Sequence, residues 1–203
     1  MTWMSWLSLC AICCAGALSP GPSLAVVLRH TMGGGRSHGI LAGLFHAFGV
    51  GLWALATVAG LSLLIVQSPG LYQLLTWAGA GYLAWLGLKA LRSAGQAPLA
   101  WGGGDPVSAM RAGLDGFMIS LFNPKLAVFF LALFSQFVTP DMTMTGQALM
   151  VATAAVIDGL WYSLVALVLS RSDVLSRLGK RARLIDRITG VILLLLALRV
   201  ITF

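Results

Sequence analysis

Charged residues are scarce in this sequence of 203 residues: Asp, Glu, Lys and Arg together make up 9% of it, while 59% of the residues are hydrophobic. This composition excludes a soluble domain, because such a domain needs a largely polar surface. Residues 1–28 and 40–88 contain no charged side chain. Since a helix that crosses a bilayer needs about 20 mostly apolar residues, the sequence predicts an all-α integral membrane protein.

Catalytic and metal-binding motifs are also missing. The sequence contains no phosphate-binding loop of the Gly-x-x-x-x-Gly-Lys type and no Gly-x-Ser-x-Gly elbow, which argues against a primary pump and against a serine hydrolase. We therefore expect a protein that is not an enzyme and needs no cofactor. Cys10, Cys13 and Cys14 all fall in the first apolar stretch, and the loops lack clusters of histidine or acidic residues that would gather a metal. We interpret these cysteines as small apolar side chains and expect no metal site, with a membrane thiol redox carrier and a metal-ion exporter as alternatives.

Six apolar stretches are long enough to cross the membrane. They lie near residues 4–28, 40–66, 71–91, 112–138, 144–170 and 185–203. The first lacks the basic residues that begin a secretory signal, so we expect it to be a retained helix. Eleven of the 13 Lys and Arg residues flank or fill the first, third and fifth connections. Basic residues collect in cytoplasmic loops, which places both termini on the outer, periplasmic side of a bacterial inner membrane.

The net charge of +7 is explained by this distribution. Because the basic residues flank membrane spans instead of covering one soluble face, we expect contact with membrane lipids and no nucleic-acid partner.

Two segments of the sequence resemble each other. Residues 22–26 read PSLAV and residues 124–128 read PKLAV, and the following span of each half contains Gly-Leu-Trp, at 51–53 and at 159–161. Each predicted unit has three spans, so the two copies must lie in opposite orientations, as in secondary transporters. The sequence thus predicts two inverted three-helix repeats, residues 1–92 and 111–203, joined by a cytoplasmic linker at 93–110.

Helix-breaking residues interrupt the first and the fourth spans near their middle. Ser19-Pro20-Gly21-Pro22 lies in the first span and Asn123-Pro124 in the fourth. Such breaks persist in a membrane only where protein or a water-filled cavity satisfies the freed backbone groups. A half-helix that begins after each break would direct its positive end at a shared site, which suits a carboxylate. The alternative is a proline kink that only shapes the bundle.

Ionisable side chains at membrane depth are the other candidates for function. Lys125 and Asp158 lie far from any predicted interface, and His46 lies at a similar depth. A charge at the middle of a bilayer costs at least about 2.5–3.5 kcal/mol, so such residues usually pair with another group or act in transport. The structural alternatives are an ion pair between Lys125 and Asp158, a bond from Asp158 to a neighbouring hydroxyl, and a helix–helix contact for His46. Asp115, near a span end, is assigned no role.

Several of these elements together resemble the LysE/RhtB family of bacterial amino-acid exporters. They are Ser19-Pro20-Gly21-Pro22, the basic first loop, residues 79–87 (GAGYLAWLG), Asn123-Pro124-Lys125 and Asp158. The resemblance covers essentially the whole chain and implies amino-acid efflux driven by the proton gradient. It leaves the solute, the stoichiometry and the oligomeric state open, with a homo-oligomer as one possibility.

These observations give a hypothesis for the site. The carboxylate of the solute would lie against the half-helix starts formed by Pro20, Gly21, Pro22, Ser23, Asn123, Pro124 and Lys125. Its ammonium would pair with Asp158, which would hold either that ammonium or a proton, with His46 as a second proton-coupling residue.

Overall fold

The computed structural model describes residues 1–19, 21–92, 107–169, 183–184, 187–195 and 197–198. All regular secondary structure in these ranges is helical, which confirms the predicted fold class. The helices are α1 (Trp3–Leu18), α2 (Pro22–Gly34), α3 (Arg36–Gln67), α4 (Pro69–Arg92), α5 (Ala109–Leu121), α6 (Pro124–Phe134) and α7 (Met144–Leu169). Residues 187–195 form a further helical segment.

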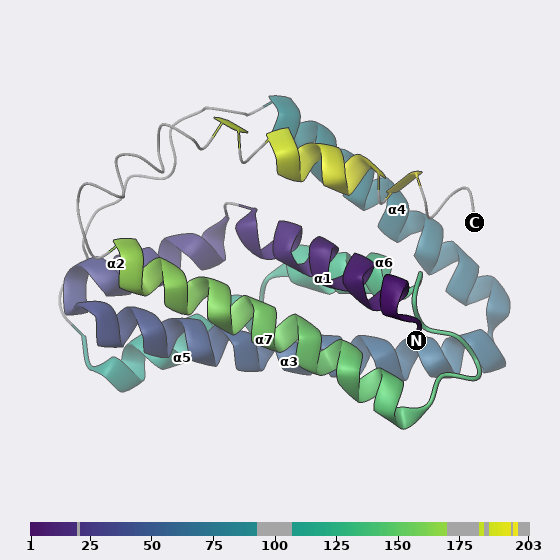
Figure 1. Ribbon diagram of the computed structural model, residues 1–203, viewed down its shortest axis with the longest axis horizontal. Coiled ribbons are helices and arrows are strands. Elements are labelled where there is room, and N and C mark those ends of the chain that lie inside the picture. Colours follow the sequence, from purple (N-terminus) through teal and green to yellow (C-terminus); the bar gives the residue numbers. More distant parts are fainter. Residues whose placement is uncertain (20, 93–106, 170–182, 185–186, 196, 199–203) are drawn as a thin grey trace.

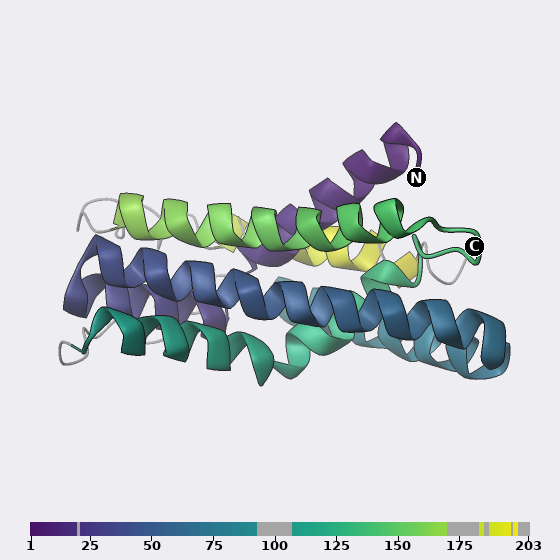
Figure 2. The same ribbon diagram turned by 90° about the horizontal axis from the view of Figure 1, so that it is seen from below.

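The two longest helices, α3 and α7, run side by side along the molecule (Figure 1). Helices α2 and α5 lie along one half of this pair, and α1 and α6 lie along the other half. Viewed from below, α1 leans away from the bundle toward the amino terminus (Figure 2). The starts of α2 and α6 therefore come together near the middle of the molecule.

Glycine allows α3 and α7 to approach each other closely. A Cβ added to Gly43 would lie 2.8 Å from the Cβ of Tyr162, and one added to Gly159 would lie 3.2 Å from the Cβ of Ala47. Small residues at such spacing are typical of helix packing in membranes. This close contact brings the middle of α3 against the middle of α7.

The described helices differ in their ability to cross a membrane. Helices α3 and α7 are each long and apolar enough to cross a membrane. Helices α1 and α2 meet this condition only when they are counted together as one bent span, and the same holds for α5 and α6. Large side chains such as Phe48, Trp77 and Leu160 are more than half exposed, as suits a surface that faces lipid. Helix α4 does not meet the same criterion, and residues 185–186, 196 and 199–203 of the last predicted span lie outside the described residues. The count of six spans and the inverted repeat thus stay predictions.

Proline begins a helix at both predicted interruptions. Pro22 is the first residue of α2 and Pro124 is the first residue of α6. The axes of α1 and α2 differ by 61°, and those of α5 and α6 differ by 55°. Proline fits the first turn of a helix, where its missing N–H leaves no bond unmade. Both interruptions are therefore found where the sequence indicated them, although Pro20 lies outside the described residues.

One boundary differs from the prediction. Arg29 was expected in the first connection, but it lies within α2, which continues to Gly34. Only Gly35 separates α2 from α3, and its φ of 85° is a left-handed conformation that glycine adopts at little cost. Hydropathy alone ended the span too early because the first charged residue sits inside the helix.

Candidate functional site

The buried acid of α7 is paired with the buried histidine of α3. His46 Nδ1 lies 2.7 Å from Asp158 Oδ2, and both residues are buried. The ring of His46 also packs edge-on against Tyr162, with centroids 4.8 Å apart. His46 Nε2 has no hydrogen-bond partner among the described residues. The two residues that the sequence assigned to proton coupling are therefore in direct contact.

Asn123 connects the two interrupted spans. Its Oδ1 accepts a hydrogen bond of 3.0 Å from the Lys125 backbone N–H, which caps the start of α6. Its Nδ2 donates to Ser23 Oγ, 3.3 Å away, in the first turn of α2. The start of α2 itself has no side-chain cap, so part of its backbone hydrogen-bonding capacity is left for a ligand.

Lys125 extends from the start of α6 to the start of α2. Its Nζ donates a hydrogen bond of 2.7 Å to Ser19 Oγ. A Cβ added to Gly21 would lie 3.8 Å from the same Nζ, so the ammonium group lies beside the N-terminal end of α2. An ammonium group and a helix start are both positively charged features, and their proximity favours an anion between them.

These residues surround one cavity. Of the predicted site residues, Gly21, Pro22, Ser23, Asn123, Lys125 and Asp158 line it. Pro124 is not in the lining but begins the helix that carries Lys125, and His46 lies behind Asp158 and is also not in the lining. The rest of the wall is made by Cys13, Gly16, Ala17, Ser19, Val50, Leu86, Leu126, Phe129, Phe130, Ala154, Tyr162 and Leu193.

Among the lining residues that were not predicted from the sequence as site residues, three carry a hydroxyl or thiol group. Tyr162 lies one turn after Asp158 on α7, a spacing that indicates the same helix face. Ser19 belongs to the first interruption, which was the available signal for it. Cys13 was interpreted only as small apolar filling, yet it lines the cavity. No group of three or more His, Cys or Asp residues in the described ranges is placed to hold a metal ion.

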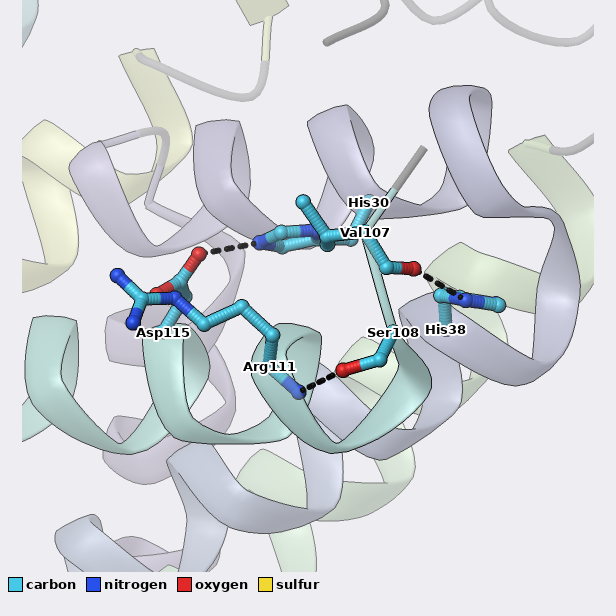
Figure 3. A network of polar contacts seen from close by, with 6 residues as sticks. All are labelled: His30, His38, Val107, Ser108, Arg111 and Asp115. Carbon is cyan, nitrogen blue, oxygen red and sulfur yellow. Dashed lines mark hydrogen bonds and ion pairs between the residues drawn. The ribbon is translucent and has the colours of Figure 1, made fainter. Parts of the chain in front are cut away.

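A second polar cluster lies at the far end of α2 (Figure 3). His30 Nε2 lies 3.1 Å from Asp115 Oδ2 on α5, and Arg111 Nε forms an ion pair with Asp115 Oδ1 at 3.0 Å. His38 Nε2 donates to the carbonyl oxygen of Val107, 2.9 Å away. The cluster joins α2 and α3 to the beginning of α5, and so gives Asp115 a role in packing that the sequence did not indicate.

Comparison with known proteins identifies the family. The family model described as LysE type translocator matches residues 14–202. The chain belongs to the LysE family. The family resemblance predicted from the motifs is therefore confirmed, and the chain is a multi-pass membrane protein of a family of transporters.

Three relatives are named as efflux proteins for particular solutes. The chain is 26% identical to the threonine efflux protein of Escherichia coli (strain K12) over 192 residues, which cover 93% of each chain. It is 32% identical to the leucine efflux protein of Enterobacter sp. (strain 638) over 136 residues, or 66% of this chain and 64% of the relative. It is 30% identical to the homoserine/homoserine lactone efflux protein of Salmonella typhimurium over 159 residues, or 77% and 76%. No solved structure matches the chain.

Proposed function

We propose that this protein exports amino acids from the bacterial cytoplasm across the inner membrane, in exchange for protons. The observation that carries the proposal is the meeting of two broken spans around a cavity that contains one ammonium group, from Lys125, and one carboxyl group, from Asp158. An amino acid carries a carboxylate, which can pair with the ammonium group of Lys125, and an ammonium group, which can pair with the carboxyl group of Asp158. The names of the LysE relatives, which are efflux proteins for threonine, leucine and homoserine, support the same class of solute.

The solute carboxylate binds at the start of α2 in this proposal. There it meets the ammonium of Lys125 and the uncapped backbone amides of the first turn, near Ser23. Binding of anions at a helix N-terminus is favoured by the free N–H groups and by the helix dipole. The Asn123 amide holds Ser23 and the start of α6 in place, so the two halves of the carboxylate site keep a fixed separation.

The solute ammonium binds to Asp158, and this step provides the coupling. A carboxylate at membrane depth is costly unless it is paired. Asp158 therefore holds either a proton or the ammonium of the solute. His46 stabilises the charged form through its contact with Oδ2, and it can pass a proton to or from that oxygen. Because the two cations exclude each other, outward movement of the solute is exchanged for inward movement of a proton.

Alternating access follows from the predicted repeat. Units 1–92 and 111–203 would rock against each other around the cavity, with the linker at 93–110 on the cytoplasmic side. The contact of His30 with Asp115 joins the α2 part of the first unit to the α5 part of the second. In the topology predicted from the basic residues, with both termini outside, this contact lies at the cytoplasmic end and must loosen when the site opens inward.

The test is efflux of radiolabelled amino acids from proteoliposomes that contain the purified protein. We expect amino acids to leave the vesicles against their concentration gradient when a pH gradient, acidic on the receiving side, is imposed, and we expect a protonophore to stop this movement. Protein-free vesicles and vesicles with Asp158→Asn protein are the controls. Passive exchange of amino acids without any response to the pH gradient would disprove the antiport part, and absence of all amino-acid movement would disprove the function.

A further inference from the structure

The wall of the cavity has a polar part and an apolar part. The charged and hydroxyl-bearing groups lie at the level of the breaks and on α7, and they include Ser19, Ser23, Lys125 and Asp158. Beyond the breaks, along α1 and α6, the wall is apolar and includes Cys13, Gly16, Phe129 and Phe130. Phe129 follows Lys125 by four residues on α6, which is one helical turn or about 6 Å. This is about the distance from the α-carbon of an amino acid to the end of a medium-sized side chain.

The charges of the cavity are matched by the main-chain groups of an amino acid alone. Lys125 and Asp158 are the charged residues in the lining formed by the described part of the chain. A bound zwitterion uses the ammonium of the first and the carboxylate of the second, which leaves no described acidic group for a second ammonium on the solute. Among the lining hydroxyl groups, that of Ser19 accepts a hydrogen bond from Lys125 and that of Ser23 accepts one from Asn123.

From these features we infer that the solute is a neutral amino acid with an apolar side chain, such as valine, leucine or methionine. The inference rests on the proposed function and narrows its substrate class. The solute side chain points from the breaks along α1 and α6 and packs against the rings of Phe129 and Phe130. A cationic side chain in the same place meets no second carboxylate among the described lining residues, and a hydroxyl group there faces the rings of Phe129 and Phe130.

The size of this discrimination follows from the cost of unpaired polar groups. An uncompensated charge at membrane depth reduces occupancy about 100-fold or more. An added hydroxyl group in an apolar pocket is rejected less strongly, by up to about 100-fold. We therefore expect almost no transport of lysine and slow transport of threonine.

Gly16 limits the length of the accepted side chain. A Cβ added there would lie 2.6 Å from Cζ of Phe129, which is too close for the ring to stay in place. Phe129 is buried among other side chains and lines the cavity, so its displaced ring would move into the cavity. The apolar part of the cavity would then become smaller. The substitution Gly16→Ala should thus slow the transport of methionine more than the transport of alanine.

The decisive experiment is counterflow of matched amino-acid pairs into proteoliposomes that contain the wild-type protein. Valine and threonine are nearly isosteric, and methionine and lysine have similar lengths. We expect valine to be transported at least about tenfold faster than threonine. We expect methionine to be transported about 100-fold faster than lysine. Transport of lysine or threonine at least as fast as its apolar partner would overturn the inference while leaving amino-acid export intact. Failure of every amino acid to move would instead disprove the proposed function as well.

Substituted proteins give a second measurement that does not depend on absolute activity. Cys13→Asp places an acid in the apolar wall, and Cys13→Ser is its uncharged control. The ratio of lysine to methionine transport should rise at least about tenfold in the first and stay within about twofold of wild type in the second. The ratio of methionine to alanine should fall in Gly16→Ala. Unchanged ratios in active Cys13→Asp and Gly16→Ala proteins would show that the solute side chain does not enter this region.

Discussion

The side chains of His46 and Asp158 lie 2.7 Å apart, although 112 residues separate them in the sequence. The pair links α3 to α7 at the point where small residues let the two helices approach each other. Asp158 faces the cavity and His46 lies behind it, so the histidine can act on a solute only through the acid.

Asp158→Asn should abolish uphill export. The amide cannot release a proton and carries no charge for the solute ammonium, so affinity should fall by about 100-fold. Export driven by a pH gradient in proteoliposomes measures this effect. Asp141→Asn is the matched control, because Asp141 is exposed in the turn before α7. Asp158→Asn protein that still concentrates the solute in response to the gradient would contradict the assigned role.

His46→Ala should raise the KM for export without removing coupling. The variant loses a hydrogen bond to a charged group, which is worth about 1.5–3 kcal/mol, and Asp158 then binds the ammonium less well. His46→Asn should recover part of the loss, since its amide can donate near the position of Nδ1. Equal KM values for the alanine variant and the wild type, at equal amounts of folded protein, would show that the pair does not support binding.

Much of this arrangement could be predicted from the sequence, because it depends on local patterns. Apolar stretches gave α3 and α7 to within a few residues, and the proline motifs gave the breaks before Pro22 and Pro124. Asp158 and Lys125 were recognised because charges are rare at membrane depth. Their presence in one cavity agrees with the expectation that the two breaks meet.

The pairing of side chains across helices could not be predicted in the same way. His46 bonds to Asp158, and Lys125 bonds to Ser19, whereas the sequence equally allowed an ion pair between Lys125 and Asp158. The choice depends on the rotation of each helix about its axis, which is set by packing of small residues and by the angle at each break. No local pattern encodes either quantity.

The contact between His30 and Asp115 should stabilise the closed packing of α2 on α5. His30 is 4% exposed, so Asp115→Ala leaves a buried ring nitrogen unpaired and should cost about 1–3 kcal/mol. Thermal unfolding in detergent measures the loss. Arg111→Ala is the control, because Arg111 is 67% exposed and an exposed pair contributes at most about 1 kcal/mol. Equal effects of the two substitutions on thermal unfolding would mean that the buried contact adds nothing to the stability of the protein.

Cys13 should be a reporter of solute binding. It is buried but lines the cavity, so a small thiol reagent must enter the cavity to reach it. In Cys10→Ala/Cys14→Ala protein, we expect the reagent to inhibit export and a saturating exported amino acid to slow the labelling. The matched control retains only Cys14, which is exposed and should be labelled at the same rate with and without solute. An equal rate of Cys13 labelling with and without the solute would show that the solute binds elsewhere.

The central claim is that one carboxyl group, that of Asp158, exchanges a proton for the ammonium of the solute. The most direct measurement is the change in pH when purified protein, in weakly buffered detergent solution with an indicator dye, binds the amino acid that it exports best. Wild-type protein should release protons in proportion to bound solute, and Asp158→Asn protein should release none. Binding by the wild type without proton release, or equal release by both proteins, would contradict the claim.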